Sequence, residues 1–349
     1  MKGVSPPRID LLSDTVTKPT PAMREAMARA EVGDDVFGED PTVRRLEEQL
    51  SALLGHQDAV FVPSGTMSNQ IALRLHCRPG DELICEASCH IFNYEQAGHA
   101  QLSGLAILPI AGNAGVIELA QLDDKIRPDN VHFPVTRLLT LENTHNRCGG
   151  RVLPYDNVSA ICRWAKEHGL ATHLDGSRLF NAVAASGIPA ADWSQHFDTV
   201  NICFSKSLGA PVGSALSGTA EMIRVARRHR KLLGGGMRQS GILAAAALYA
   251  LEHHVDRLPE DHAKAQVIAD AIRQSDGLEL AFETVDTNIV IFEVAERLGT
   301  AADFCDALRQ QGVRMMPVSR QRVRAVTHLD VSLEDCREVA EILCRSGDT

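Results

Sequence analysis

The feature that most constrains the fold of this chain is a regular alternation of short apolar runs with helical segments. The apolar runs cover residues 59–63, 82–85, 106–110, 138–141, 171–174 and 199–204, and each has the length of a buried strand. Neighbouring segments such as residues 41–54 and 158–169 carry apolar side chains at helical spacing. Strands that alternate with helices build a mostly parallel sheet with both faces covered. The sequence therefore predicts a large α/β domain.

The pattern changes near Arg257, where a second and smaller unit is predicted to begin. Helices are predicted at residues 262–274, 301–311 and 333–344, and strands at residues 287–292, 313–316 and 323–328. At about 100–200 residues per domain, a length of 349 residues fits two domains. We predict an N-terminal arm and large domain over residues 1–255 and a small C-terminal α+β domain over residues 256–349.

Charge and composition exclude several classes of partner. The chain carries 35 Lys and Arg against 45 Asp and Glu, whereas a nucleic acid or an anionic membrane requires a basic face. The longest apolar run, residues 241–251, is shorter than the roughly 20 residues that span a bilayer. Nine cysteines without a C-x-x-C pair and a polar N-terminus favour reduced thiols and no zinc site. We therefore expect a cytoplasmic protein without a nucleic-acid, membrane or metal partner.

Lysine is scarce in this sequence, and one lysine has an unusual position. Of the seven lysines, Lys206 directly follows a predicted apolar strand and precedes a loop of small residues. An amine that is partly desolvated at the edge of a sheet can form a Schiff base. The alternative is a structural lysine whose alkyl chain is buried along apolar surface.

Two other segments lie at the predicted carboxyl ends of strands, where α/β sheets bind ligands. Ser64, Gly65 and Thr66 turn from a strand into a helix, whose N-terminal N–H groups can hold a phosphate, although an ordinary capped turn is the alternative. Asp175 closes another strand and could pair with the protonated ring nitrogen of pyridoxal phosphate. Arg178 could bind a substrate carboxylate, or form a local ion pair with Asp175.

His90 lies on a predicted loop, where a single histidine is more often structural than functional. The combination carries more information than any one residue. A phosphate-binding turn, then an aspartate at a strand end, then a lysine after a later strand is the order expected of a pyridoxal-phosphate site. The sequence therefore predicts such a site on the large α/β domain.

Residues 9–332 resemble the low-specificity L-threonine aldolases, which are fold-type I pyridoxal-phosphate enzymes with an aspartate-aminotransferase-like large domain. Eight motifs carry the resemblance: DLLSDTVT at 10–17, GDDVFGEDPT at 33–42, PSGTMSN at 63–69, LENTHN at 141–146, HLDGSR at 173–178, FSKSLGAPVG at 204–213, GGGMRQ at 234–239 and VTHLD at 326–330. Two positions depart from the family pattern, since Leu12 stands where arginine is common and Phe37 where tyrosine is common. These departures could alter substrate range or cofactor anchoring.

The resemblance implies a role for each site residue. For the cofactor, these roles are the Schiff base (Lys206), the pyridine nitrogen (Asp175), ring stacking (His90), and phosphate or ring contacts (Ser64, Gly65, Thr66, Arg178). For the substrate, they are the carboxylate (Ser13, Arg178, Arg324) and the β-hydroxyl (His90, His145). Lys231 and Arg238 resemble residues that complete a neighbouring subunit's site, which implies a homodimer or homotetramer.

The implied reaction is the cleavage of L-threonine, L-allo-threonine and other β-hydroxy-α-amino acids to glycine and an aldehyde. Two histidines placed for a β-hydroxyl favour an aldolase over three alternative functions. The alternatives are a pyridoxal-phosphate-dependent β-eliminating lyase, an aminotransferase, and a non-catalytic protein that only binds the cofactor. Such an enzyme would contribute to glycine biosynthesis and threonine catabolism.

Overall fold

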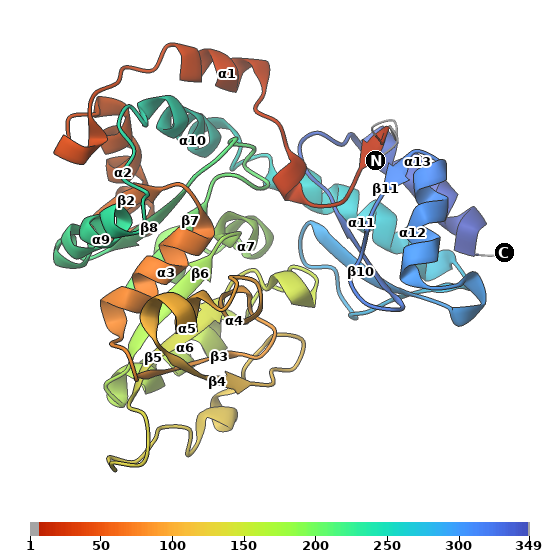
Figure 1. Ribbon diagram of the computed structural model, residues 1–349. Helices are drawn as coiled ribbons and strands as arrows, with labels where there is room; N and C mark the ends of the chain where they lie inside the picture. The colour runs from red at the N-terminus through yellow and green to blue at the C-terminus, as the bar shows by residue number, and fades with distance from the viewer. Residues whose placement is uncertain (1–6, 348–349) are drawn as a thin grey trace.

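The computed structural model describes residues 7–347, and its largest element is a seven-stranded sheet (Figure 1). The strand order is β2-β8-β7-β6-β5-β3-β4. In chain order the strands are β2 (Asp58–Val62), β3 (Glu82–Glu86), β4 (Ala106–Ile110), β5 (Thr136–Glu142), β6 (Ala171–Gly176), β7 (Thr199–Cys203) and β8 (Ser214–Gly218). Neighbouring strands pair in parallel except β8, which is antiparallel to both β2 and β7. The predicted mostly parallel sheet is confirmed.

Helices cover both faces of this sheet, as the strand side chains require. Along β2, Val60 and Val62 belong to one buried cluster, whereas Ala59 and Phe61 belong to another. Because successive strand residues point to opposite faces, this alternation shows that both faces are apolar and covered. The helices around the sheet are α1 (Pro21–Ala28), α2 (Pro41–Leu54), α3 (Gly65–His76), α4 (His90–Asn93), α5 (Gly98–Ser103), α6 (Tyr155–Glu167), α7 (Leu179–Ser186), α8 (Ala190–Ser194), α9 (Ala220–Leu232) and α10 (Gly241–His253).

Local sequence explains the ends of the longer helices. Asp40 caps α2 by accepting from the N–H groups of Thr42 and Val43, and Pro41 occupies the first helical position. Gly55 then ends the helix in the left-handed conformation, with φ of 67°. The predicted bounds of α2 are therefore those observed. The strand β8 was not predicted, because Ser-Ala-Leu-Ser-Gly contains no β-branched or aromatic residue although every position is buried.

The C-terminal part contains a four-stranded antiparallel sheet of order β12-β13-β10-β9. Its strands are β9 (Leu278–Leu280), β10 (Ile289–Val294), β12 (Met316–Pro317) and β13 (Arg322–Val326), and its helices are α11 (Leu258–Gln274), α12 (Ala301–Gln310) and α13 (Leu333–Gly347). The short strand β1 (Ile9–Asp10) pairs in parallel with β11 (Val313–Arg314). Ile9 and Leu11 are buried in the same apolar cluster as α11, α12 and α13. The first described residues thus pack on the C-terminal part, and the boundary at residue 255 stays a prediction.

The arm after β1 crosses from the C-terminal part to the large sheet, ending at α1 (Figure 1). On the way, Thr17 Oγ1 donates to the carbonyl oxygen of Lys206 at 3.0 Å. Lys18 N donates to Asp330 at 3.0 Å, which holds the arm to the C-terminal part as well. No helix within residues 7–347 is both long enough and apolar enough to cross a membrane.

Candidate active site

Three neighbouring parallel strands place polar side chains at one edge of the large sheet. Glu142 on β5 is paired in register with Asp175 on β6, and Asp175 is paired with Asn201 on β7. All three side chains are buried. Since the carboxyl ends of parallel strands meet at one edge, and ligands bind there in α/β sheets, this row marks the candidate site.

Asp175 is held at the centre of the row by four hydrogen bonds. Its Oδ1 accepts from Ser177 Oγ at 2.7 Å, Ser177 N at 3.2 Å and Asn201 Nδ2 at 3.0 Å. Its Oδ2 accepts from Asn69 Nδ2 at 2.9 Å. The donors come from α3, from β7 and from the turn after β6, so the carboxylate has one fixed orientation.

The charge state of Asp175 follows from its neighbours. Burial by itself raises the pKa of this carboxyl, but the positive charges of His90 and Lys206 oppose that effect. Together with the hydrogen bonds from Ser177 and Asn69, they hold the pKa of Asp175 well below its ordinary value. A buried, ionised carboxylate of this kind can stabilise a protonated pyridine nitrogen.

Lys206 lies just beyond the end of β7, as the sequence predicts. Its carbonyl oxygen accepts from Gly209 N at 2.8 Å and from Thr17 Oγ1 at 3.0 Å, so a tight turn and the arm fix its backbone. Its charge lowers the pKa of both Asp175 and Asp14. The amine is therefore near the two buried carboxylates of the site.

The N-terminus of α3 lies beside this network. Ser64 is the N-cap and accepts from Met67 N at 3.2 Å, while Gly65 and Thr66 are the first two helical residues, whose N–H groups have no partner inside the helix. A Cβ added at Gly65 would lie 2.6 Å from Cys203 Sγ, so the close approach of α3 to β7 requires glycine. These positions fit the phosphate of the predicted cofactor, because an anion is stabilised at a helix N-terminus.

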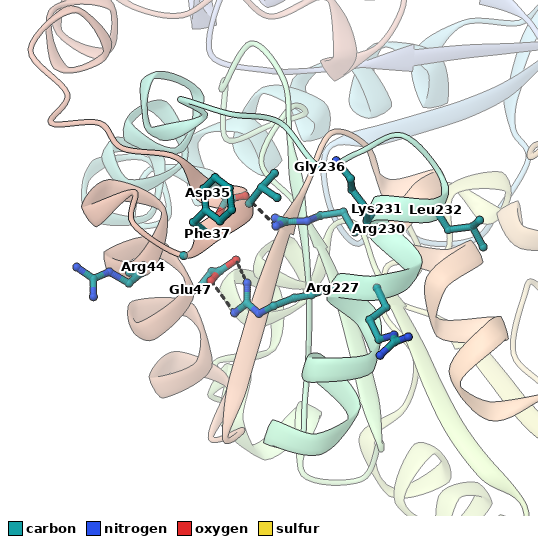
Figure 2. Close-up of a pocket in the computed structure, with 12 residues that line it drawn as sticks. Asp35, Phe37, Arg44, Glu47, Arg227, Arg230, Lys231, Leu232 and Gly236 are labelled. Carbon is teal, nitrogen blue, oxygen red and sulfur yellow. Dashed lines mark hydrogen bonds and ion pairs between the residues drawn. The ribbon is translucent and has the colours of Figure 1, made fainter.

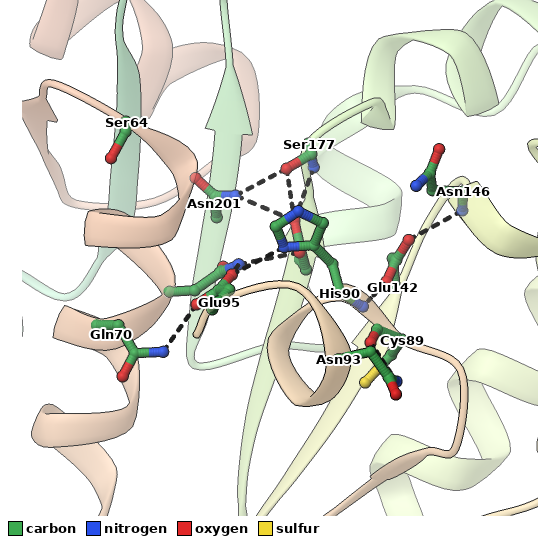
Figure 3. A network of polar contacts seen from close by, with 12 residues as sticks. Ser64, Gln70, Cys89, His90, Asn93, Glu95, Glu142, Asn146, Ser177 and Asn201 are labelled. Carbon is green, nitrogen blue, oxygen red and sulfur yellow. Dashed lines mark hydrogen bonds and ion pairs between the residues drawn. The ribbon is translucent and has the colours of Figure 1, made fainter. Parts of the chain in front are cut away.

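His90 faces the same network from the first position of α4 (Figure 3). Its Nδ1 donates to Glu95 Oε1 at 3.0 Å, and its backbone N–H donates to Glu142 Oε2 at 2.6 Å. Burial lowers the pKa of His90, but Glu95 and Asp175 outweigh burial and raise it above its ordinary value. The ring is about one-third exposed, which suits a side chain that meets a ligand.

Glu95 connects His90 with Asp175. Its side chain is fully buried and accepts from Asn69 Nδ2 at 2.7 Å, from Gln70 Nε2 at 2.7 Å and from His90. The Asn69 amide thus donates to both carboxylates. Ligating atoms of His90, Glu95 and Asp175 lie within 4.8 Å of one another, the spacing of a metal site. Amide donors from Asn69 and Gln70 already bond to oxygens of these two carboxylates.

His145 lies in a neighbouring cluster and is only 1% exposed. Its Nε2 is 2.9 Å from Glu86 Oε2, which also accepts from Ser88. Burial lowers the pKa of His145, but Glu142, Cys148 and Glu86 outweigh it and raise the pKa well above its ordinary value. No hydrogen bond within the described chain joins His145 to His90, so its contact with a β-hydroxyl stays a prediction.

The residues predicted to bind a carboxylate do meet, but Arg178 is already paired. Its Nε and Nη2 donate to the two carboxylate oxygens of Asp14, both at 2.7 Å. Asp14 is fully buried and also accepts from Ser207 Oγ at 2.9 Å. Ser13, next in the arm, is buried and accepts from Thr15 at 2.9 Å. The two-pronged edge of Arg178 therefore binds the arm rather than being free for a ligand.

Arg324 reaches the same place from β13 of the C-terminal part. Its Nη1 donates to Asn146 Oδ1 at 3.1 Å and its Nη2 to the carbonyl oxygen of Leu12 at 3.2 Å. Burial lowers the pKa of Arg324 to about 10, and the nearby charge of Arg178 acts in the same direction. The residues predicted to bind a carboxylate thus come from both parts of the molecule and from the arm.

Lys231 and Arg238 lie in a different region, where Lys231 lines a cavity of about 790 Å³ (Figure 2). Lys231 lines this cavity at the end of α9, together with the exposed side chains of Phe37 and Leu232. Arg238 pairs with Asp34 at 2.9 Å. Across residues 7–347, no hydrogen bond or ion pair connects Lys231 or Arg238 to Lys206, Asp175 or His90. The structure does not bring these two residues into the site of their own subunit.

Several site residues were not assigned a role from the sequence. They share polar side chains that orient another site residue, all buried except the half-buried Asn146: Asp14, Asn69, Glu95, Glu142, Asn146 and Asn201. Four of them lie inside the motifs that carry the family resemblance, at 10–17, 63–69 and 141–146. In the sequence, the polar character of these four residues within the motifs was the one indication of a role. It did not show which side chain each of them would bond.

Comparisons with known proteins show relatives over nearly the whole chain. The sequence pattern of the beta-eliminating lyase family matches residues 10–297. The low specificity L-threonine aldolase of Escherichia coli (strain K12) is 45% identical over 333 residues, which cover 95% of this chain and 97% of that protein. The probable low-specificity L-threonine aldolase 2 of Arabidopsis thaliana is 43% identical over 337 residues, which cover 95% of each chain.

Solved structures show the same fold. The threonine aldolase of Leishmania major superposes with a TM-score of 0.84 at 21% identity, covering 97% of this chain and 99% of that one. A putative aromatic amino acid beta-eliminating lyase/threonine aldolase from Exiguobacterium superposes with a TM-score of 0.80 at 22% identity, covering 98% and 97%. The predicted fold-type I architecture is confirmed.

Proposed function

Because the chain belongs to the beta-eliminating lyase family and, within it, to the low-specificity L-threonine aldolases, we propose that it cleaves L-threonine and L-allo-threonine to glycine and acetaldehyde. The observation that carries the proposal is the buried, ionised Asp175, which lies near Lys206 and His90 at the carboxyl edge of the sheet. Other β-hydroxy-α-amino acids would release the corresponding aldehyde.

The site fits pyridoxal 5'-phosphate, the cofactor of this family. Lys206 offers the amine for the cofactor's aldehyde carbon, Asp175 the carboxylate for its ring nitrogen, and the N-terminus of α3 at Gly65 the N–H groups for its phosphate. When bound, the cofactor supplies an electron sink for the negative charge that develops at Cα of the substrate. Asp175 would support that role, because its ionised carboxylate would keep the ring nitrogen protonated.

The other residues orient the substrate and move protons. Arg324 would bind the carboxylate, and His90, whose side chain is about one-third exposed, would lie against the cofactor ring and face the β-hydroxyl. Cleavage removes the hydroxyl proton, breaks the Cα–Cβ bond to release the aldehyde, and returns a proton to Cα to give glycine. His90, or a water that it holds, accepts the hydroxyl proton, since a positioned histidine contributes about 10²–10⁴-fold to such steps.

The experiment is a turnover assay on the purified holoenzyme with L-threonine, L-allo-threonine and L-phenylserine. Equimolar glycine and aldehyde are expected, and Lys206→Ala abolishes both turnover and the visible absorbance of the bound cofactor. Lys166→Ala, on the exposed face of α6, is the matched control and keeps both. Undiminished turnover by Lys206→Ala would refute the role of this lysine.

The matched family is described as beta-eliminating lyases, so elimination is the second candidate reaction. It would release ammonia and a keto acid rather than glycine and an aldehyde. The same assay therefore distinguishes the two reactions. Pyruvate formed from serine or cysteine, without glycine from threonine, would replace the aldolase proposal with the lyase.

We further propose that the active enzyme is a homodimer or homotetramer in which Lys231 and Arg238 complete the site of a neighbouring subunit. Lys231 lines a separate cavity and Arg238 pairs with Asp34, next to the lining residue Asp35, and this position away from Lys206 supports the assignment. Phe37 and Leu232 expose 72% and 67% of their surface beside the same cavity, as subunit interfaces do before assembly.

Two remaining assignments are also proposals. The division into domains at residues 255 and 256 is supported by the separate apolar cluster that α11, α12 and α13 form with their sheet. A cytoplasmic location is supported by the nine cysteines, all of which are free thiols, because disulfides are rare in that compartment.

A further inference from the structure

The carboxylate subsite contains two buried arginines whose charges are balanced differently. Arg178 and Arg324 are each 7% exposed, and the charge of each disfavours the other. Arg178 is neutralised by the two-pronged ion pair with Asp14. Within residues 7–347, Arg324 forms no ion pair, and its Nε is buried without a hydrogen-bond acceptor. A buried cation without a counter-ion is costly, so Arg324 is the group that requires an anion.

A neutral side chain occupies the space between these two cations. Asn146 Oδ1 accepts from Arg324 Nη1 at 3.1 Å and from Arg178 Nη1 at 3.5 Å. An oxygen that bridges two guanidinium groups stands where a carboxylate oxygen would otherwise be expected. Because the amide carries no net charge, it accepts these hydrogen bonds without neutralising Arg324.

Asn146 is fixed in this position by the catalytic edge of the sheet. Its backbone N–H donates to Glu142 Oε1 at 2.9 Å, and the other oxygen of Glu142 accepts from the backbone N–H of His90 at 2.6 Å (Figure 3). The buried carboxylate of Glu142 thus holds both Asn146, between the two arginines, and His90, which the proposed function places at the β-hydroxyl.

We propose that Asn146 is a specificity-determining residue whose neutral amide leaves one uncompensated positive charge, on Arg324, for the carboxylate of an α-amino acid. This inference rests on the proposed function for the identity of the site. It adds a role for Asn146 in the preference for substrates with a free carboxylate. The enzyme binds α-amino acids with a free carboxylate and discriminates against their amides, esters and amino alcohols. A carboxylate at position 146 would satisfy Arg324 internally and remove the binding charge.

The test is calorimetric titration of the purified holoenzyme with glycine and with glycinamide. Wild type is expected to bind glycine about a hundredfold more tightly than glycinamide, because only glycine pairs with Arg324. Asn146→Asp should weaken glycine binding by about a hundredfold and leave glycinamide binding within a few-fold, so that the preference disappears. The visible spectrum of the bound cofactor and the melting temperature show whether each variant is folded and loaded.

Two further variants separate charge from structure. Asn146→Ala removes the amide but keeps both guanidinium charges, so glycine should bind within about tenfold of wild type. Gln57→Glu adds one negative charge at an exposed amide, whose oxygen accepts from Ala220 N, and should bind glycine as wild type does. Equal losses in Asn146→Asp and Asn146→Ala, or a retained glycine preference in Asn146→Asp, would overturn the inference.

The proposed function and this inference fail in different ways. If wild type binds glycine with the expected preference but releases no aldehyde from threonine, the aldolase proposal fails and the subsite stands. If threonine is cleaved but Asn146→Asp still prefers glycine, the aldolase proposal stands and the role of Asn146 is refuted.

Discussion

At the scale of single residues, the site is built from buried ions whose partners are fixed. Arg178 has its ordinary charge because Asp14 accepts two hydrogen bonds from it, and Asp14 in turn is held by Ser207 beside Lys206. Breaking such a pair leaves a buried charge without compensation, which costs much more than losing a surface ion pair. Asp14 is therefore a structural requirement of the site, although it touches no predicted ligand.

The first prediction concerns the stability of Asp14→Asn. Loss of the carboxylate leaves Arg178 buried and unpaired, so the free energy of unfolding should fall by about 3–5 kcal/mol at pH 7. The control is Asp10→Asn on the same arm, where the pair with Arg314 is partly exposed and should contribute at most about 1 kcal/mol. Urea denaturation followed by circular dichroism measures both. Equal, small losses in the two variants would contradict the prediction.

The same variant has a predictable pH dependence. Burial opposes ionisation of Asp14, but Arg178 and Lys206 hold its pKa well below the ordinary value of 3.8. Its stabilising contribution is thus complete above about pH 4 and is lost as the pH falls toward the folded-state pKa. The stability difference between wild type and Asp14→Asn should be constant from pH 6 to 7 and shrink below about pH 4. A difference that grows on acidification would refute this account.

Glu95 provides a second prediction at this scale. It raises the pKa of His90, which must be neutral to accept a proton from the substrate hydroxyl. In Glu95→Gln this effect is lost and burial lowers the pKa of His90, so the acid limb of kcat/KM for threonine should move to lower pH. Glu167→Gln, at an exposed position of α6, is the control and should keep the wild-type profile. An unchanged acid limb in Glu95→Gln would show that the limb does not report the titration of His90.

At the scale of elements, the site depends on how closely α3 approaches β7. Gly65 begins α3, and Cys203 ends β7 with its thiol accepting from Ser214 Oγ at 3.0 Å. A methyl group at Gly65 would lie only 2.6 Å from that thiol, which is too close for any real Cβ. Glycine at this position therefore lets the helix N-terminus reach the same edge as Asp175.

The third prediction tests this contact by cofactor binding. Gly65→Ala should displace the start of α3 and weaken the binding of pyridoxal 5'-phosphate to the apoenzyme by at least about tenfold. The double variant Gly65→Ala with Cys203→Ala removes the clashing sulfur and should recover most of the affinity, with Cys203→Ala alone as the control. Spectrophotometric titration of the apoenzyme measures each affinity. Wild-type affinity in Gly65→Ala alone would show that the contact does not matter.

Elements also explain what the sequence could and could not predict. Apolar runs and capping residues predicted β6, β7 and α2, and hence the positions of Asp175 and Lys206 at strand ends. Asn69 and Glu95 were missed as orienting residues because their partners lie on other elements, at separations that only the folded chain brings together. The same holds for Asp14 and Arg178, which are 164 residues apart in sequence.

At the scale of the whole molecule, the site lies where three segments meet. The arm contributes Asp14, the large sheet contributes Arg178 and Asn146, and the C-terminal part contributes Arg324. Any displacement of the C-terminal part relative to the sheet would therefore change the charge around the substrate carboxylate. Lys231 and Arg238 lie outside this meeting point, so their predicted role requires a neighbouring subunit.

The last prediction tests that requirement with Leu232→Asp. Leu232 is 67% exposed at the end of α9, beside the cavity that Lys231 and Phe37 line. A charge buried in a subunit interface without a partner is strongly unfavourable, so the variant should dissociate to monomers at micromolar concentration. If Lys231 and Arg238 act across the interface, cofactor affinity and activity should fall together with the molar mass measured by light scattering. Leu333→Asp is the control, because Leu333 is 40% exposed at the start of α13, where an acidic residue favours the helix. A monomeric Leu232→Asp with wild-type activity would show that each subunit contains a complete site.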